Sequence, residues 1–119
     1  MITFQPSKVL LKDISNDDKK ILIGMLEEII ITKDQFLFRK GDLINGLFIV
    51  IEGNAVSTSL DSKVTEFNDS DIIFEYNELD FFGEESLSND SYISSDYIRP
   101  ISDKLRLLYL NKEKYSIVF

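Results

Sequence analysis

The heptapeptide FFGEESL, residues 81–87, carries the residue types best suited to binding chemistry. Gly83 has no Cβ atom, and it therefore permits a left-handed backbone or a close approach to a ligand. If residues 84–87 form a short helical turn, the first N–H groups of that turn have no partners within it and can face an anion. A turn of this kind is how a phosphate cradle begins. The alternative is a strand that ends in a turn, with Glu84 and Glu85 solvated.

The amino-acid composition excludes several kinds of catalytic and metal site. Among the 119 residues there is no cysteine and no histidine, so the chain offers no thiolate, no disulfide and no imidazole base or ligand. Oxygen ligands for a hard cation remain, but the acidic residues 69–71 lack the glycine and the terminal glutamate of a calcium loop. No nucleophile stands beside a general base. We therefore expect no catalysis, no metal site and no cofactor.

The charge is negative and unevenly distributed. The formal net charge is −8, and residues 64–98 contain ten Asp or Glu and no Lys or Arg. Such a surface repels nucleic acid. The first residues lack the basic and apolar regions of a signal peptide, and no apolar run is long enough to span a bilayer. We expect a soluble, cytoplasmic protein that binds no nucleic acid and inserts into no membrane.

One amphipathic helix is expected at residues 15–28. Ser15 is a good N-cap, and acidic residues follow it in the first turn, where they complement the helix dipole. Apolar residues then recur at three- and four-residue spacing from Leu22 to Ile29, so one face of the helix should be buried.

The rest of the chain predicts short β-strands divided by turns, within a single domain spanning residues 1–119. The expected strands lie at residues 29–32, 36–38, 47–51, 55–60, 72–76 and 105–110, with a weak one at 64–67. Asn111 can cap a helix that starts near residue 112. Because the chain stops after about two turns of that helix, we expect a fragment of a larger signalling protein.

The order of these segments is more specific than any one of them. The helix at 15–28, FLFRKGD at 36–42, LFIVIEG at 47–53, FFGEESL and the final strand and helix together resemble the cyclic-nucleotide-binding domain family. This family includes regulatory subunits of cAMP- and cGMP-dependent kinases, gated channels and catabolite-activator-like proteins. The resemblance implies a mainly β fold, an antiparallel jelly-roll β-barrel with an N-terminal helix and a truncated C-terminal helix.

The resemblance also implies where a cyclic nucleotide would bind. In the family, the ligand is held by a short segment that corresponds to residues 83–87 of this chain and is called the cassette below. The glutamate of the cassette accepts hydrogen bonds from the ribose, its backbone N–H groups hold the phosphate, and a downstream arginine pairs with the phosphate. Gly83 and Glu84 match the glycine and the glutamate. Ser86 and Leu87 match the small and apolar positions, and Glu85 lies between them as a further candidate, expected to be solvated.

The arginine of the family has no counterpart in this chain. Counting forward from Phe82 places Ile93 at its position, and counting back from Tyr115 places Ser95 there, whose hydroxyl can still touch a ligand. The nearest arginine, Arg99, comes several residues later. Losing one charged hydrogen bond of about 1.5–3 kcal/mol weakens binding roughly tenfold to a hundredfold.

Two milder departures from the family pattern concern turns. Asp34 stands where a turn glycine is usual, and Asp can replace glycine there because it tolerates the left-handed backbone region. Leu79 replaces a glycine just before Asp80.

Two functions follow as expectations. The first is a ligand-sensing regulatory domain that controls an attached or associated effector such as a protein kinase, with weak or altered binding of cAMP, cGMP or a neutral nucleoside. The second is a degenerate domain that binds no nucleotide and acts as a docking or autoinhibitory module, its acidic surface offered to a basic partner.

Overall fold

The computed structural model describes residues 15–59 and 71–118, so the weak strand expected at 64–67 lies outside the described residues. The chain begins there with helix α2 (Asn16–Met25), and Ser15 caps it as predicted, its Oγ accepting a hydrogen bond from the Asp18 N–H at 3.1 Å. Leu22 is the buried residue of this helix. In the described residues, no helix has the length and apolar character needed to cross a membrane.

Helix α2 ends three residues earlier than the sequence predicts. Leu26 is already extended and opens strand β1 (Leu26–Thr32), which pairs with β7 (Lys104–Asn111) along all seven of its residues. The β-branched residues at positions 29–31 favour a strand, and this long antiparallel ladder outweighs the helical spacing of Leu26 and Ile29.

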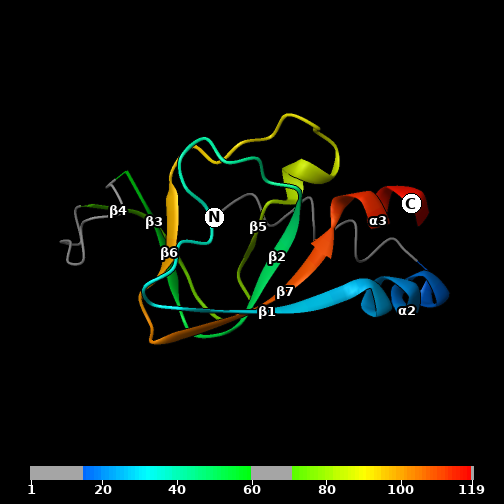
Figure 1. Cartoon of the computed structure of the whole chain (residues 1–119). Helices are drawn as coiled ribbons and strands as arrows, with labels where there is room; N and C mark the ends of the chain where they lie inside the picture. Colours follow the sequence, from blue (N-terminus) through cyan, green and yellow to red (C-terminus); the bar gives the residue numbers. More distant parts are fainter. Residues whose placement is uncertain (1–14, 60–70, 119) are drawn as a thin grey trace.

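Two antiparallel sheets form the body of the molecule (Figure 1). The four-stranded sheet has the order β1-β7-β2-β5, and the three-stranded sheet has the order β4-β3-β6. The remaining strands are β2 (Gly46–Glu52), β3 (Ala55–Thr58), β4 (Ile72–Tyr76), β5 (Phe81–Phe82) and β6 (Tyr97–Pro100). The sequence does not predict β6, whose short length, arginine and proline give no clear strand pattern.

The prediction of a mainly β jelly-roll is confirmed, although the two sheets are not closed into a barrel. Strand β5 is only two residues long, so it closes little of the edge beside β2. The strand expected at 36–38 is not formed either, because Phe38 makes only an isolated bridge to Ile98. These two weak edges leave the two sheets separate.

A cluster of aromatic rings fills the space between the sheets. The rings of Phe38 and Phe48 lie 5.2 Å apart, those of Phe48 and Phe82 lie 5.4 Å apart, and Tyr76 lies 4.8 Å from Phe82. Each such pair contributes about 0.5–1.5 kcal/mol beyond its buried area. Because Phe82 is packed by rings from three other segments, the cluster fixes the residue that immediately precedes Gly83.

A second apolar cluster joins the two helices to the four-stranded sheet. Leu22, Leu47, Phe81 and Leu110 are buried in it, and Leu87 and Tyr115 pack against it. Tyr115 belongs to the terminal helix α3 (Lys112–Val118). Asn111 caps α3 as predicted, its side-chain oxygen accepting a hydrogen bond from the Lys114 N–H at 3.0 Å.

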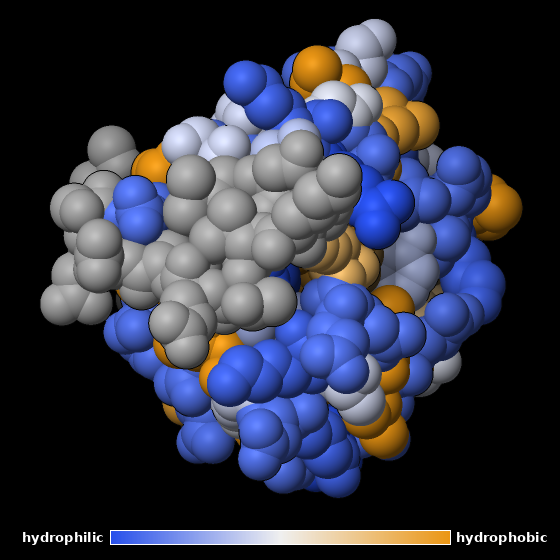
Figure 2. Space-filling view, turned by 60° about the vertical axis from the view of Figure 1, so that its left-hand side comes forward, coloured by the Kyte–Doolittle hydropathy of each residue, from blue (hydrophilic) through white to orange (hydrophobic). Residues whose placement is uncertain are grey.

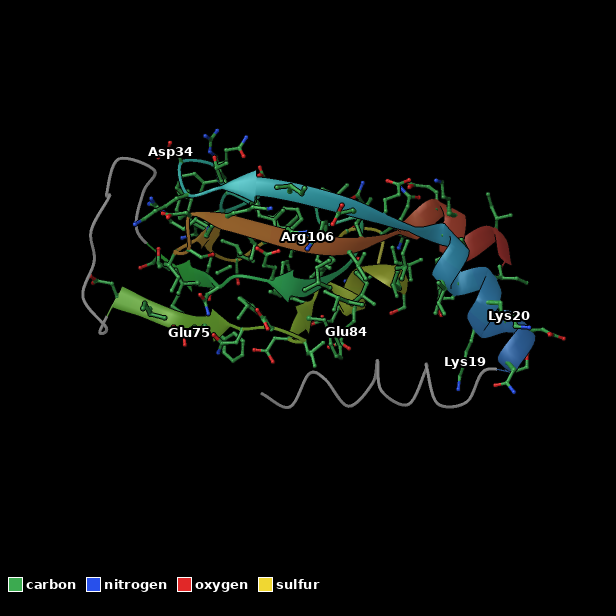
Figure 3. All side chains as sticks on the ribbon, turned by 90° about the horizontal axis from the view of Figure 1, so that it is seen from below. Lys19, Lys20, Asp34, Glu75, Glu84 and Arg106 are labelled. Carbon is green, nitrogen blue, oxygen red and sulfur yellow. The ribbon has the colours of Figure 1, made fainter. Side chains whose placement is uncertain are left out.

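The outer side of the four-stranded sheet carries an ion network across three strands. Arg106 of β7 pairs with Glu28 of β1 and, at 2.9 Å, with Glu52 of β2. Figure 3 shows Arg106 midway along this sheet, with Asp34 at one end and Lys19 and Lys20 at the other. The hydrogen bond from Arg106 lowers the pKa of the Glu52 carboxyl.

The face in Figure 2 is mainly hydrophilic, with apolar residues scattered singly over it. Scattered apolar side chains of this kind are normal for a folded domain. The described part of this face therefore offers no broad apolar patch.

Leu79 is the one residue other than glycine with a positive φ among the described residues, at 74°. The left-handed role expected for Asp34 is therefore wrong, whereas Leu79 occupies a backbone region that suits the glycine it replaces. Its N–H donates to the Val50 carbonyl at 2.8 Å, which holds the turn in place.

We expect Leu79→Gly to raise the free energy of unfolding by about 0.5–1 kcal/mol. The left-handed conformation costs an L-residue about 1–2 kcal/mol, and glycine avoids this cost. Part of the gain is offset because glycine loses more conformational entropy on folding than leucine does. The Leu79 side chain is 78% exposed, so little packing is lost. Urea denaturation measures the change. Leu43→Gly, at an exposed leucine whose φ is not positive, should instead lower stability. A loss of stability in Leu79→Gly would show that the left-handed conformation of Leu79 does not destabilise the protein.

Candidate functional site

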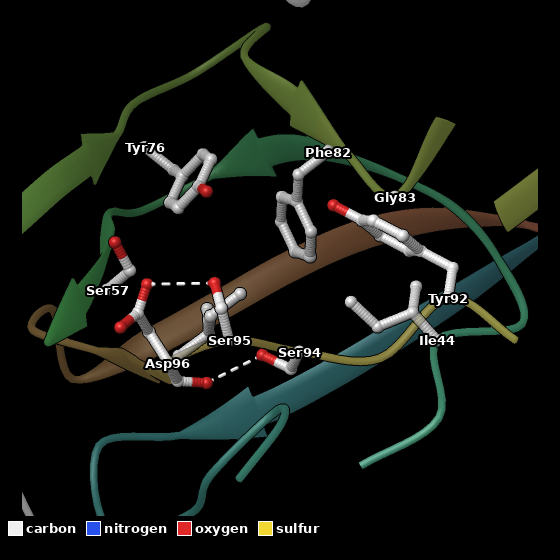
Figure 4. A pocket seen from close by; sticks show the side chains of 10 residues that line it. Ile44, Ser57, Tyr76, Phe82, Gly83, Tyr92, Ser94, Ser95 and Asp96 are labelled. Atoms are coloured by element: carbon white, nitrogen blue, oxygen red, sulfur yellow. Dashed lines mark hydrogen bonds between the residues drawn. The ribbon is translucent and has the colours of Figure 1, made fainter. Parts of the chain in front are cut away.

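A small open pocket of about 70 Å³ lies beside the cassette (Figure 4). Three aromatic residues, two isoleucines, three serines, one glycine and one carboxylate line it: Tyr76, Phe82, Tyr92, Ile44, Ile98, Ser57, Ser94, Ser95, Gly83 and Asp96. They come from β3, β4, β5 and β6, from the loops before β2 and β6, and from Gly83 just after β5. The pocket therefore draws its walls from both sheets.

Gly83 forms the corner between β5 and the next turn. Its φ is 87°, and a Cβ atom there would overlap the carbonyl oxygen of Gly46 and press on Ile44. The turn after it, η2 (Glu84–Leu87), is a single 3₁₀ turn, which is the helical one of the two alternatives that the sequence left open for this segment. Only glycine satisfies both the left-handed backbone and the close approach.

The structure separates the predicted cassette residues into distinct environments. Glu84 is buried, but it is not among the residues that line the pocket. Glu85 is exposed and accepts a hydrogen bond from the Tyr92 hydroxyl at 3.2 Å. Ser86 is fully buried, and its hydroxyl donates to the carbonyl oxygens of Gly83 and Gly46 at 2.6 and 3.1 Å. The Ser86 hydroxyl thus braces the turn.

The two positions that sequence counting offers for the missing arginine also differ. Ser95 lines the pocket, whereas Ile93 is 54% exposed and does not. Ser95 Oγ donates to Asp96 Oδ2 at 3.2 Å. Gly83 and Ser95 are therefore the predicted site residues that the fold brings together at the pocket, and Leu87 packs in the second apolar cluster instead.

Several pocket residues have no clear signal in the sequence. Tyr76, Tyr92 and Asp96 look like ordinary strand or loop residues. Ser57 has a weak signal, since it is a polar residue that follows two apolar ones in strand β3, where it is buried. A buried hydroxyl in a strand interior often has a binding or structural partner.

Comparison with known proteins identifies the fold. No protein-family model and no curated protein matches the sequence. Solved structures do match. One is the regulatory subunit of a cAMP-independent protein kinase A from Trypanosoma brucei, in a mutant form bound to cAMP in the A site. This match covers 92% of the chain at 15% sequence identity, with a TM-score of 0.71. The chain has the cyclic-nucleotide-binding domain fold.

Two further solved structures agree. The C-linker/CNBHD of zELK channels covers 92% of the chain at 16% identity with a TM-score of 0.74. The regulatory domain of Toxoplasma gondii PKA with cAMP covers 90% at 20% identity with a TM-score of 0.69. All three are longer proteins, of which this chain covers 37%, 57% and 39%.

In this cyclic-nucleotide-binding fold the three arginines of the chain all lie outside the pocket lining. The guanidinium carbons of Arg39 and Arg99 stand 5.5 and 5.0 Å from the ring centroid of Phe36. Arg99 follows the pocket residue Ile98 in β6, and successive strand residues point to opposite faces. Arg106 is ion-paired on the outer side of the other sheet.

The electrostatic environment of the pocket is negative. Burial, followed by the charges of Tyr92, Asp96 and Glu85, raises the pKa of Tyr76 to about 12. Burial, followed by the charge and hydrogen bond of Glu85 and the charge of Glu84, raises the pKa of Tyr92 to about 12. Burial and the nearby carboxylates both disfavour a phenolate here, and both would also disfavour an anionic ligand. Within the described residues, no group of acidic side chains is arranged to hold a metal ion.

Lys112 connects the cassette to helix α3. Its Nζ donates a hydrogen bond to the Ser86 carbonyl oxygen in η2 and pairs with Asp90 at 2.8 Å. Its backbone N–H donates to the Asn45 carbonyl at 2.9 Å. The Lys112 side chain is only 14% exposed, and its hydrogen bond lowers the pKa of the Asp90 carboxyl. A shift of η2 would therefore act directly on the first residue of α3.

Proposed function

We propose that this chain is a regulatory module that senses a small ligand in the pocket and controls an attached or associated effector such as a protein kinase, with only weak binding of cAMP and cGMP. The observation that carries this proposal is the lining of the pocket. None of the three arginines contributes to it, whereas the carboxylate Asp96 does.

The charge balance supports weak affinity for a phosphodiester. A charged hydrogen bond from arginine to phosphate contributes about 1.5–3 kcal/mol, and this pocket lacks one. Asp96 adds repulsion at the same place, and the raised pKa values of Tyr76 and Tyr92 indicate that further negative charge is unfavourable there. The missing arginine hydrogen bond alone lowers the affinity for a cyclic nucleotide by about tenfold to a hundredfold or more.

The Trypanosoma brucei structures support a regulatory role without cAMP control. That regulatory subunit belongs to a cAMP-independent protein kinase A, and the cAMP-bound form carries three substitutions, one of which replaces a threonine with an arginine. We infer that the cyclic-nucleotide-binding fold of the present chain can also serve a regulatory role without cAMP control.

The contacts of Lys112 supply a route for the signal. A ligand that binds better to one position of Gly83 or Ser95 shifts the equilibrium between conformations of the adjoining turn η2. Because Lys112 holds the Ser86 carbonyl oxygen, α3 follows that turn. Helix α3 is the element through which we expect the effector to be reached.

Introducing an arginine at Ser95 tests the proposal. In calorimetric titrations, we expect wild-type protein to bind cAMP and cGMP with dissociation constants no tighter than about 1 mM, and Ser95→Arg to bind roughly tenfold to a hundredfold tighter. The matched control is Ser91→Arg, an exposed serine of the same loop that does not line the pocket.

Micromolar binding of either cyclic nucleotide by wild-type protein would contradict the proposal. An equal gain in Ser91→Arg would show that net charge, rather than the position in the pocket, limits affinity. If wild-type protein and Ser95→Arg both ignore the cyclic nucleotides, adenosine and guanosine, the docking or autoinhibitory module becomes the better explanation, since its acidic surface needs no pocket ligand.

A further inference from the structure

The two sides of the pocket differ in chemistry. Figure 4 shows the rings of Tyr76, Phe82 and Tyr92 along one side, with Ser57, Ser95 and Asp96 facing them. The Asp96 segment is held in place because its carboxylate accepts the Ser95 hydroxyl at 3.2 Å and its backbone carbonyl accepts the Ser94 hydroxyl at 2.6 Å. The pocket thus places a fixed carboxylate opposite an aromatic wall.

An aromatic wall facing a carboxylate suits a positive charge. The ring quadrupoles of Tyr and Phe attract a cation, and recognition of quaternary ammonium groups by aromatic cages depends on this attraction. A second carboxylate stands just outside, because the Tyr92 hydroxyl donates to Glu85. No Lys or Arg competes among the described residues of the lining.

The electrostatics of the tyrosines agree with this assignment. Burial is the largest cause of the raised pKa of Tyr76 and Tyr92, and burial disfavours a charge of either sign. The carboxylates of Asp96 and Glu85 add to the shift at Tyr76, and those of Glu85 and Glu84 add to the shift at Tyr92. It is this second contribution, from nearby negative charge, that stabilises a cation in the pocket.

The size of the pocket limits the ligand to a small group. One water molecule needs about 10–15 Å³ of such volume, and the pocket offers about 70 Å³. That volume accommodates a head group of several heavy atoms, with the rest of the ligand directed to solvent through the open side.

We propose that the pocket binds a small organic cation, an ammonium head group that contacts Tyr76, Phe82 and Tyr92 and has Asp96 as its counter-ion. This inference rests on the proposed function in that it takes the same pocket as the ligand site. It adds the class of ligand, a cation, whereas the ligand expected from the family resemblance carries an anionic phosphate.

Choline and its neutral isostere 3,3-dimethylbutan-1-ol test the sign of the charge. In NMR titrations of the full chain at low salt, we expect choline to shift the amide signals around Tyr92 and Asp96 with a dissociation constant of about 1–10 mM. We expect the neutral alcohol to bind at least about tenfold more weakly, since it has the same shape without the charge.

Asp96→Asn identifies the counter-ion, because an asparagine oxygen can still accept the Ser95 hydroxyl. We expect this variant to lose about tenfold in choline affinity. Asp103→Asn removes the same charge at an exposed residue outside the pocket lining and should bind choline like wild-type protein. The comparison of choline with the alcohol on wild-type protein needs no variant to fold.

Equal affinity for choline and the alcohol, unchanged choline binding in Asp96→Asn, or no shift with choline at about 100 mM would each overturn the cation inference. Those results leave the proposed function standing as long as cAMP and cGMP bind weakly and Ser95→Arg gains affinity. Micromolar cAMP binding by wild-type protein would remove the proposed function and the cation inference together.

Discussion

Replacing Gly83 with alanine is expected to lower the free energy of unfolding by about 2–5 kcal/mol. The left-handed conformation at φ 87° costs an L-residue about 1–2 kcal/mol. The new methyl group also overlaps the Gly46 carbonyl oxygen, and overpacking of this kind costs about 1–3 kcal/mol. Urea denaturation followed by circular dichroism measures the change.

Gly41→Ala separates these two contributions. Gly41 also has a left-handed backbone, with φ 93°, but a Cβ atom there would meet nothing within 4 Å. We expect Gly41→Ala to lose only the conformational part, about 1–2 kcal/mol. If Gly83→Ala cost no more than Gly41→Ala, the close approach of Gly83 to Gly46 would not be a source of stability.

The position of Gly83 gives this substitution a functional consequence as well. Gly83 lines the pocket and precedes η2, and Gly46, which its methyl group would displace, begins β2. A shift at this corner moves the Ser86 hydroxyl, which bonds to both glycine carbonyls. The cassette is therefore a packed part of the fold.

Lys112→Ala is expected to lower the free energy of unfolding by about 2 kcal/mol and to loosen α3. The Ser86 carbonyl loses its charged donor, and an unsatisfied buried acceptor costs about 1–3 kcal/mol. The partner Asp90 is 93% exposed, so most of the loss comes from the carbonyl contact. Urea denaturation gives the free energy, and amide hydrogen exchange in α3 reports the loosening.

Lys114→Ala is the matched control for this prediction. Lys114 lies two residues further along α3 and pairs with Glu27 at 2.9 Å, but both side chains are about half exposed, at 55% and 51%. Exposed pairs contribute little to stability, so unfolding and α3 exchange should remain close to wild type. Similar losses in both variants would mean that charge on α3 matters and that the contact with η2 does not.

Local chemistry was enough to predict the elements whose determinants lie close together in sequence. The caps of Ser15 and Asn111, the strand at β2 and the turn after Gly83 depend on residues within about four positions, so the chain specifies them before it folds. The order of these elements was sufficient to predict the cyclic-nucleotide-binding fold, which the structural matches confirm.

Where long-range pairing competes with a local preference, the sequence alone was insufficient. Helix α2 stops at Met25 because Leu26 pairs with Leu110 across the sheet, and the barrel stays open because β5 and the segment around Phe38 pair too little. Both outcomes depend on pairing between residues that lie far apart in the sequence.

The composition of the pocket was likewise decided by tertiary structure. The sequence by itself showed that the family's arginine is missing and that the segment around Gly83 is acidic. Only the folded chain places Arg99 on Phe36 and brings Tyr76 and Asp96 to the same pocket. These side chains meet because antiparallel pairing of β3 with β4 and β6 brings distant segments together, and that pairing is determined by the whole core.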